Sequence, residues 1–476
     1  MTNADESILC VDLDGSLVAT DLLAESILLL LKKNPLYLIM LPVWLLRGRA
    51  YLKHEIARRV KLDAANLPYH AGVLSWLRDE HRRGRQIILA TGGDAALASC
   101  VADHLGLFSA VHASDGRTNL KGPAKSALLA DRYGSGGFAY VGNSPADLPI
   151  WRRADSAIIV GGSDALAAQV AASTPVTRRF DTACRHPARA LLRAMRPHQW
   201  VKNLLLFVPL VTAHQLTNMA AAGAAIRAFA AMCLASAAIY VVNDLLDLQS
   251  DRAHSTKRLR AFASGQSPIW YGMLLSPALV IAAFAIASQL PREFTLWLAA
   301  YIAATVVYSL RLKHTAIIDV LVLATLYTVR LIAGAAAIEV PVSPWLLAFS
   351  LFFFLSLALL KRFSEIDAAV REGDGPESIR GYRPVDRDAI GQFGVVSGYL
   401  SILVMALYTN SREIVTLYSH PVWLWGFCPL LLYWISRIWL CAYRGDMHED
   451  PIMFAVRQAS SYIVVAGLGA FMYLAI

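Results

Sequence analysis

The sequence predicts a soluble α/β domain followed by an all-α polytopic membrane bundle of about nine transmembrane helices. Of the 476 residues, 56% are hydrophobic and 17% are charged. Soluble domains contain about 25% charged residues, so much of this chain is expected to lie in lipid. Charges are frequent before residue 195, whereas long apolar stretches alternate with short polar loops from Leu204 to Ile476.

This change in hydropathy divides the chain into three segments. We predict a soluble domain over residues 1–180, a basic linker with an interfacial helix over residues 181–202, and a transmembrane domain over residues 203–476. The net charge of +9 fits basic loops facing anionic lipid, so the expected partner is a membrane bilayer and not a nucleic acid. The six cysteines have no metal or disulfide spacing, and the N-terminus has no signal peptide, so the soluble domain is expected in the cytoplasm.

Three short apolar runs of the soluble domain end in polar residues. Ile8–Val11, Gln86–Ala90 and Phe138–Val141 are predicted strands, and helical patterns such as Ala95–His104 and Ala124–Arg132 lie between them. Such alternation is typical of an open parallel sheet, whose site lies at the carboxyl ends of the strands. The polar residues at these ends are Asp12, Asp14, Thr91 and Asp147.

These residue types suit phosphoryl chemistry. Asp12 and Asp14 could divide the roles of nucleophile and general acid/base. Asp147 could complete an oxygen-only Mg²⁺ site, and Thr91 with a lysine could hold phosphoryl oxygens.

The set resembles the haloacid dehalogenase superfamily over about residues 5–170. The resemblance implies that Asp12 forms an aspartyl-phosphate and shares Mg²⁺ with Asp147, that Asp14 is the acid/base, and that Thr91 binds phosphate. Lys125 fits the family's local lysine pattern and Lys121 fits its spacing; we prefer Lys125.

Two positions depart from the family pattern. Ser16 stands where Thr is usual, and Asn143 stands where an acidic residue is common, which removes a charge from the metal site. An inactive domain of the same fold is the alternative. Residues 20–70 occupy the place of the family's small helical cap, and Lys32 and Lys33 interrupt its apolar run too soon for a spanning helix. Either this cap contacts the bilayer surface, or its apolar residues are buried within the domain as in an ordinary cap helix.

In the membrane half, about nine apolar segments are long enough to span. Basic residues are concentrated in the loops after alternate segments, and the positive-inside rule places these loops in the cytoplasm with the soluble domain. The segments are centred near residues 210, 233, 278, 302, 327, 352, 401, 430 and 466.

An acidic stripe follows the second segment. At helical spacing Asn243, Asp247 and Asp251 share one face, with Asp244 beside Asp247. Carboxylates crowded in this way repel one another unless a cation lies between them, and hard oxygen ligands select Mg²⁺. The alternative is a solvated helix end whose acids pair with Arg252 and Lys257.

This NDxxDxxxD pattern and the number of spans resemble the UbiA-type intramembrane prenyltransferase superfamily over about residues 190–476, and within it the decaprenyl-phosphate phosphoribosyltransferases. Members that use aromatic acceptors would carry a second DxxxD motif after the sixth span, which is absent from the loop containing Glu365 and Asp367. The residues behind the narrower resemblance are Arg196–Asn203, Asp251, Arg252, Thr256–Arg258, Leu312–His314, Asp319, Arg330, Ala333, Gly334, Lys361, Arg362 and Glu365.

The resemblance implies Mg²⁺-dependent transfer of 5-phosphoribosyl from phosphoribosyl diphosphate to a polyprenyl phosphate in the bacterial inner membrane. Asp247 would be catalytic, with Asn243, Asp244 and Asp251 as further metal ligands. Arg330 lies mid-span and should face the interior, either to bind lipid phosphate or to pair with a buried acid. The other candidate substrate-binding residues are Lys202, Asn203, Lys257, Arg258, Asp319, Lys361, Arg380 and Tyr382.

Fusion of the two domains suggests that the soluble domain removes the 5-phosphate of the lipid product. Two alternatives remain at this point: prenyl transfer to an aromatic acceptor, and a membrane-anchored phosphatase whose bundle is not catalytic. A domain without its own substrate, which only supports the bundle, is also compatible with the sequence, as is an oligomer.

Overall fold

The computed structural model describes residues 7–181, 187–254, 256–372, 380–411, 414, 417–447 and 450–476. Residues 182–186 of the predicted linker, including Cys184, lie outside the described residues. The chain divides into two compact units, which are residues 1–195 with 240–277, and residues 196–239 with 278–476.

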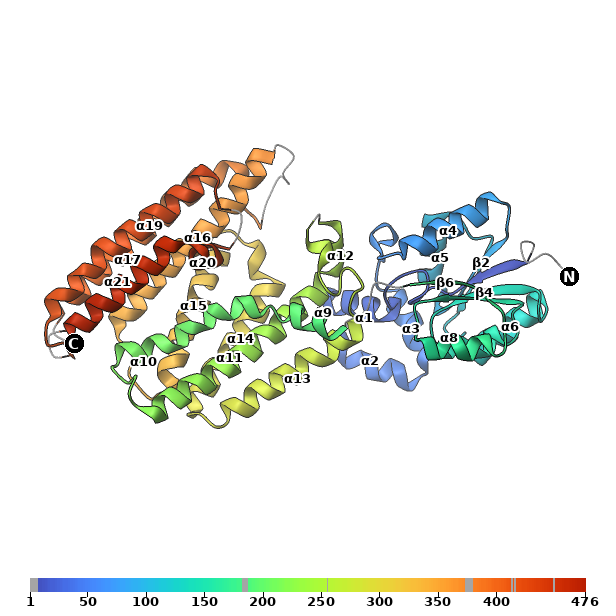
Figure 1. The fold of residues 1–476 in the computed structure, drawn as a ribbon, viewed down its shortest axis with the longest axis horizontal. Helices are drawn as coiled ribbons and strands as arrows, with labels where there is room; N and C mark the ends of the chain where they lie inside the picture. Colours follow the sequence, from blue (N-terminus) through green and yellow to red (C-terminus); the bar gives the residue numbers. More distant parts are fainter. Residues whose placement is uncertain are drawn as a thin grey trace. The chain divides into compact units, whose positions relative to one another are not determined.

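A six-stranded parallel sheet forms the centre of the first unit, in the order β3-β2-β1-β4-β5-β6 (Figure 1). Both faces are buried, since Leu9 and Val11 enter one core and Cys10 enters the other. The strand order reverses between β1 and β4, which opens a crevice at their carboxyl ends. The strands are β1 Ile8–Val11, β2 Ile87–Asp94, β3 Ala110–Ser114, β4 Phe138–Gly142, β5 Ser156–Val160 and β6 Val176–Phe180.

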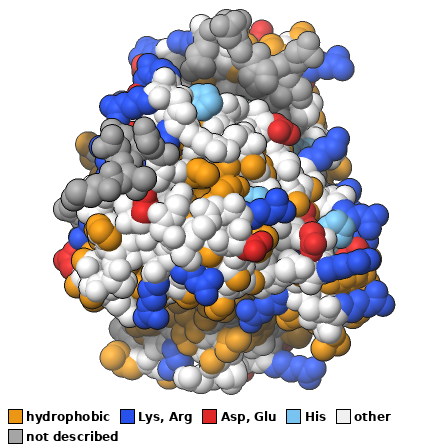
Figure 2. Space-filling view, turned by 90° about the vertical axis from the view of Figure 1, so that its right-hand side faces the viewer, with side chains coloured by type: hydrophobic (Ala, Val, Ile, Leu, Met, Phe, Trp, Pro, Cys, Tyr) orange, Lys and Arg blue, Asp and Glu red, His pale blue; other side chains and the backbone are white. Residues whose placement is uncertain are grey.

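Helices cover both faces of the sheet, which confirms the predicted open α/β domain. Trp76 of α4 and Val101 of α5 pack on one face, and Leu129 of α6, Trp151 of α7 and Val170 of α8 on the other. Lys and Arg side chains predominate over acidic ones on the surface of this domain that Figure 2 shows. The helices are α4 Ala71–Arg82, α5 Ala95–Leu105, α6 Pro123–Tyr133, α7 Leu148–Trp151 and α8 Asp164–Ala171.

Three short helices form the cap between β1 and α4, namely α1 Leu22–Lys33, α2 Tyr37–Leu46 and α3 Arg49–Ala57. Asp21 caps the start of α1 by accepting a hydrogen bond from the Ala24 amide at 3.0 Å. As expected, none of the three is long enough to cross a bilayer.

Among the described residues, seven helices are long and apolar enough to span a membrane, and α20 with α21, bent by 84°, would make an eighth. The segment expected to span near residue 210 is not one of these helices. The chain there forms a 3₁₀-helix, η3 Pro197–Phe207, and then a short helix, α10 Val208–Thr212, with proline first in η3 and second in α10, and neither helix alone is long enough to span. The remaining bounds are α9 Pro187–Ala194, α11 Met219–Leu246, α12 Leu248–Ala253, α13 Ile269–Ala287, α14 Arg292–Leu310, α15 Ile318–Ala337, α16 Pro344–Glu372, α17 Arg387–Thr409, α19 Phe427–Arg444, α20 Pro451–Arg457 and α21 Ala459–Ala475.

Small residues set the packing of the second unit. Gly334 of α15 lies so close to η3 that a Cβ atom there would come within 2.3 Å of the Leu206 carbonyl oxygen. Such close approach is how helices associate in lipid, where apolar burial gives little driving force. It brings Asn203 of η3 beside Arg330 of α15.

Candidate active sites

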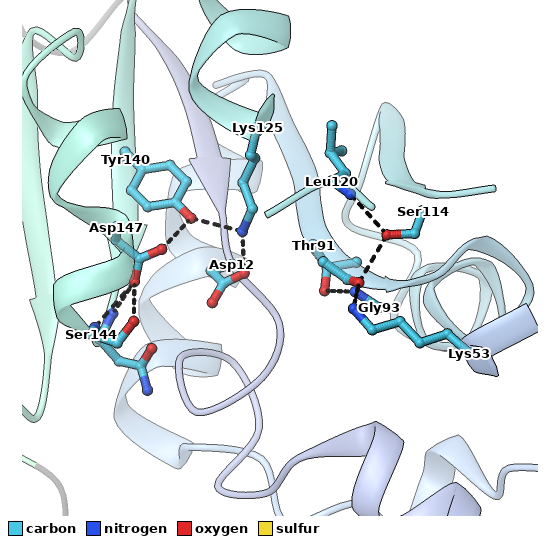
Figure 3. A network of polar contacts seen from close by, with 12 residues as sticks. Asp12, Lys53, Thr91, Gly93, Ser114, Leu120, Lys125, Tyr140, Ser144 and Asp147 are labelled. Carbon is cyan, nitrogen blue, oxygen red and sulfur yellow. Dashed lines mark hydrogen bonds and ion pairs between the residues drawn. The ribbon is translucent and has the colours of Figure 1, made fainter. Parts of the chain in front are cut away.

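A chain of polar contacts links three of the predicted residues at the sheet edge (Figure 3). Lys125 Nζ of α6 donates to Asp12 Oδ1 at 2.7 Å and to Tyr140 Oη at 3.1 Å. Tyr140 in turn donates to Asp147 Oδ1 at 3.1 Å. Lys121 is exposed, so the structure places Lys125 on the predicted nucleophile.

Asp147 is held in a fixed orientation just after β4. Its Oδ2 accepts three hydrogen bonds of 3.1 Å, from the Asn143 amide, the Ser144 amide and the Ser144 hydroxyl. The side chain of Asn143 lies against the first motif, where a Cβ atom on Gly15 would be 2.1 Å from Asn143 Nδ2. Gly15 has φ +75°, so the close approach and the backbone both require glycine there.

Thr91 lies fully buried in β2, and its Oγ1 accepts a hydrogen bond from the Gly93 amide at 3.0 Å. The neighbouring Gly92 carbonyl accepts from Lys53 Nζ at 2.6 Å and from Ser114 Oγ at 2.9 Å (Figure 3). Because Lys53 belongs to α3, this hydrogen bond links the cap to the carboxyl end of β2.

The surroundings of the Asp14 carboxyl favour its protonated form. The carboxyl accepts a hydrogen bond from the Leu22 amide at 2.9 Å. Burial raises the pKa of Asp14 to about 7, and the neighbouring Asp21 carboxylate adds to the shift. Burial also raises the pKa of Asp12, although the Lys125 ammonium opposes that shift. An acid with a pKa near neutrality can both donate and accept a proton at physiological pH.

The acidic stripe forms at a break between two helices. Helix α11 ends at Leu246, and Asp247 has φ −100° and ψ 13°, so the expected continuous helix is wrong, although Asp251 N still donates to Asp247 O at 2.8 Å. Asp244 and Asp251 are buried and share Arg260 Nη1, at 3.2 and 2.8 Å. Asp247 Oδ1 lies 3.3 Å from Lys32 Nζ of the cap, and Asn243 is half-buried on α11.

In the alternative pairing of the stripe, Arg252 is paired with another acid, whereas Lys257 does act electrostatically on Asp251. Arg252 donates to both oxygens of Glu25 in α1, at 3.0 and 2.5 Å, and Lys257 is exposed on a short 3₁₀-helix together with Arg258.

Within the described residues, no group of three or more His, Cys, Asp or Glu lies close enough to hold a metal ion. The donors present nevertheless suit Mg²⁺. Asp244 and Asp251 are oxygen ligands that already share one positive group. Asp12 and Asp147 form a second pair, linked through Lys125 and Tyr140. Mg²⁺ at the first pair requires Arg260 to move.

A cationic cluster lies in the second unit, formed by Lys202, Lys361, Arg330 and one acid, Asp450. The acid accepts from Lys202 Nζ at 2.9 Å and from Lys361 Nζ at 3.3 Å. The Tyr327 ring lies 6.0 Å from Lys202 Nζ and 5.3 Å from the Arg330 guanidinium carbon. Three of these four side chains are cationic and one is anionic, and the Glu365 carboxylate also acts electrostatically on Lys361.

Arg330 is buried and faces the interior of the bundle, as expected. Its hydrogen-bond partners in the described part of the chain are neutral, namely Asn203 Oδ1 at 2.9 Å, Tyr301 Oη at 2.8 Å and the Leu326 carbonyl at 2.7 Å. The alternative of a buried acid as its partner finds no support among these contacts. A desolvated guanidinium with neutral partners favours an anionic ligand.

Three predicted binding residues, Asp319, Arg380 and Tyr382, instead join a network that is balanced in charge. Asp319 and Arg362 are fully buried and paired, and Asp319 also accepts from Tyr382 Oη. Arg362 also pairs with Glu365, and Arg380 Nη1 lies 3.2 Å from Tyr308 Oη. Arg362 neutralises Asp319, and the network links the start of α15 to α16 and to Tyr382 in the segment that follows α16.

Several functional partners were missed by sequence reasoning. Asp450 lies far along the chain from Lys202, and Arg260 reaches Asp244 and Asp251 only because the loop after α12 folds back, so no local spacing indicates either residue. Tyr140 could have been noticed as a hydroxyl inside an otherwise apolar strand beside the catalytic edge.

These features define a multi-pass membrane protein with an N-terminal α/β domain. The model of the UbiA prenyltransferase family matches residues 205–461. The chain thus belongs to the UbiA prenyltransferase family.

Three relatives show how far the similarity extends. The protein y4nM of Sinorhizobium fredii, whose function is uncharacterised, is 36% identical over 461 residues, which are 96% of this chain and 89% of that protein. The nodulation protein NoeC of Azorhizobium caulinodans is 34% identical over 60% of this chain and 93% of its own length. The decaprenyl-phosphate phosphoribosyltransferase of Mycolicibacterium smegmatis is 37% identical over 38% of this chain and 59% of that enzyme.

Proposed function

We propose that the bundle transfers 5-phosphoribosyl from phosphoribosyl diphosphate to a polyprenyl phosphate. A phosphate oxygen of the lipid forms a bond to ribose C1, and the bond from C1 to diphosphate breaks with its electron pair leaving on diphosphate. The observation that carries the proposal is the cationic cluster, since a net positive group in lipid suits a phosphate-bearing lipid. The name of the 37% identical phosphoribosyltransferase supports the choice of donor and acceptor.

In this reaction Lys202, Arg330 and Lys361 bind phosphate oxygens, and Asn203 orients the Arg330 guanidinium through its 2.9 Å hydrogen bond. Lys257, Arg258 and Arg380 are the further candidates for binding the sugar phosphate. Asp319 and Tyr382 hold the surrounding loops.

The residues Asn243, Asp244, Asp247 and Asp251 would hold Mg²⁺. When bound there, Mg²⁺ supplies charge neutralisation for the leaving diphosphate. Arg260 occupies the cation position between Asp244 and Asp251, so its guanidinium would move to the diphosphate oxygens as the acids take up the metal.

The α/β domain then removes the 5-phosphate from the lipid product. An Asp12 oxygen forms a bond to phosphorus as the bond to the ribose 5-oxygen breaks, and Asp14 gives its proton to that oxygen. Asp14 next takes a proton from the water that hydrolyses the aspartyl-phosphate. Thr91 and Lys125 hold the phosphoryl oxygens, and Asp12 with Asp147 would hold the second Mg²⁺. The products are polyprenyl-phosphoryl-ribose and inorganic phosphate.

Both sites would face the cytoplasm at the bacterial inner membrane. The basis is the concentration of basic residues, among them Lys257, Arg258, Arg311 and Lys313, in the loops that follow alternate spans.

The test is incubation of the detergent-purified protein with Mg²⁺, polyprenyl phosphate and phosphoribosyl diphosphate labelled in the ribose carbons. We expect label in the lipid phase with the wild type and none with Asp247→Asn. A change in the labelled lipid between wild type and Asp12→Asn would identify the phosphatase substrate.

Absence of label in the lipid would contradict the proposal. Labelling of an aromatic acid by a prenyl diphosphate would then indicate the aromatic-acceptor reaction instead. Lipid labelling that persists in Asp247→Asn would contradict the role of the acidic stripe.

A further inference from the structure

Helix α2 exposes an unusual amount of apolar surface for a part of an α/β domain. All ten residues from Tyr37 to Leu46 are uncharged, and only Trp44 is buried. Ile39 is 69% exposed and Leu46 is 89% exposed. The other exposed large apolar residues on and just before the helix are Leu36, Leu38, Met40, Val43 and Leu45. A contiguous apolar surface of this kind marks an interaction site.

Basic residues flank this surface at both ends. Lys32 and Lys33 precede the helix, Arg47 and Arg49 follow it, and all four are exposed. No acidic residue occurs between Lys32 and His54. An apolar centre between basic ends is complementary to the acyl chains and phosphate groups of an anionic lipid surface.

The same unit contains the start of a spanning helix next to α2. Met273 of α13 packs into the small core formed by Trp44, Leu41 and Ile27. At the first turn of α13, Trp270 and Tyr271 are exposed, and Trp270 Nε1 donates to Asp21 Oδ2 at the start of α1 at 3.1 Å. Exposed Trp and Tyr at the end of a span occupy the lipid headgroup level. Because the first turn of α13 packs against the cap, we expect the cap to lie at the depth of the lipid headgroups.

We infer that α2 docks into the surface of the bilayer, with its apolar side among the acyl chains and its basic flanks at the lipid phosphates. Ten helical residues extend about 15 Å, whereas the hydrocarbon core is about 30 Å thick, so the helix lies in one leaflet and does not cross.

Docking of α2 gives the phosphatase edge direct access to lipid. Helix α3 follows α2 after Gly48, and Lys53 of α3 is hydrogen-bonded to the Gly92 carbonyl beside Thr91. The cap that is anchored in lipid is thus the same element that covers the catalytic carboxylates. This consequence rests on the proposed function, because it requires a substrate phosphate carried on a lipid.

The experiment places the photoreactive residue p-benzoylphenylalanine at position 39 in the full chain. The protein is reconstituted in vesicles of phosphatidylethanolamine and phosphatidylglycerol, irradiated, and analysed by mass spectrometry. We expect lipid adducts at position 39. Position 82 serves as the control, since Arg82 is exposed at the end of α4 and should give none.

Equal lipid labelling at positions 39 and 82, or no labelling at position 39, would overturn the inference. Cross-links from position 39 to a second copy of the chain would also overturn it, because α2 would then be a protein interface. None of these readouts requires enzyme activity, so they are independent of the proposed reaction.

A second arm measures phosphate release by Ile39→Glu with Leu46→Glu. We expect loss of about tenfold or more on a phosphoribosyl-lipid in vesicles and unchanged release from a water-soluble phosphate ester, because both side chains are exposed and surface substitutions seldom disturb the fold. Loss on both substrates would contradict the access role. If the wild type releases no phosphate from the lipid, the proposed function fails while the cross-linking result still decides the docking.

Discussion

At the scale of single residues, the environment of Asp14 determines how the phosphatase domain responds to pH. The carboxyl has a pKa raised to about 7 by burial and by Asp21, so it stays protonated up to neutrality. Protonation of the leaving oxygen requires this acid form. We predict that kcat for an alkyl phosphate falls as the pH rises above about 7, by about tenfold per pH unit. The measurement is a pH–rate profile from pH 5 to 9.

The control for this prediction changes the leaving group. A nitrophenyl phosphate needs no proton on its leaving oxygen, so its profile should remain flatter over the same range. Identical profiles for the two substrates would exclude Asp14 as the acid.

Arg330 is a second residue whose surroundings predict a measurable effect. Its described partners are neutral, so an anion is expected to complete its contacts. Loss of a charged hydrogen bond costs about 1.5–3 kcal/mol, so Arg330→Gln should lower kcat/KM for polyprenyl phosphate by about ten- to a hundredfold. Arg437→Gln is the matched control, because Arg437 is exposed on α19 and contacts only a tyrosine hydroxyl in the described chain. Equal activity of the two variants would leave Arg330 with a purely structural role.

At the scale of elements, a buried ion pair connects α1 of the cap to α12 beside the acidic stripe. Glu25 and Arg252 are both buried, and Arg252 also donates to the Ala263 carbonyl at 3.0 Å. Removing one partner of a buried pair leaves an uncompensated charge, which costs about 3–5 kcal/mol. We therefore predict that Glu25→Ala destabilises the unit by about that amount, measured by pulse proteolysis in urea.

Two further variants calibrate this measurement. Asp79→Asn disrupts the exposed pair with Arg82 and should change stability by less than about 0.5 kcal/mol. Replacing both partners, as Glu25→Leu with Arg252→Leu, should recover much of the lost stability, since no buried charge remains. Failure of Glu25→Ala to exceed Asp79→Asn would contradict the burial of the pair.

Close packing of η3 on α15 gives another prediction at this scale. A methyl group on Gly334 would contact the Leu206 carbonyl, so Gly334→Ala must push η3 away together with Lys202 and Asn203. We expect transferase activity to fall while phosphate release from a soluble ester is unchanged. Gly469→Ala on α21 is the control, because nothing lies within 4 Å of a Cβ atom there. Unchanged transferase activity in Gly334→Ala would show that η3 tolerates displacement.

Local patterns predicted the elements well and their partners poorly. Strand ends such as Ile8–Val11 followed by Asp12 could be found because apolar runs and the polar residues after them are adjacent in sequence. The pairing of Arg260 with Asp244 depends on how the loop folds back, which spacing does not encode. Apolar content near residue 210 predicted a span but not its form, because hydropathy does not register that prolines divide the segment into a 3₁₀-helix and a short α-helix.

At the scale of the whole molecule, the proposed reactions are consecutive. The transferase product carries the phosphate that Asp12 would attack, and its polyprenyl chain keeps it in the bilayer. The similarity to the protein y4nM, 36% identical over 96% of this chain, extends over both units. A product retained by lipid can diffuse laterally, so one active site of each kind in a membrane is sufficient and the two need not belong to one chain.

This reasoning predicts complementation between two inactive variants. Asp12→Asn retains the bundle, and Asp247→Asn retains the sheet edge, since Asp247 is partly exposed and pairs with the exposed Lys32. Reconstituted together in the same vesicles with both transferase substrates, the two variants should form the dephosphorylated ribosyl-lipid, whereas each alone should not. In separate vesicles that are mixed, the phosphoribosyl-lipid should accumulate unchanged, because a polyprenyl chain does not exchange readily through water. Failure to complement within one vesicle, while each variant keeps its own activity, would mean that the product passes between sites of a single chain.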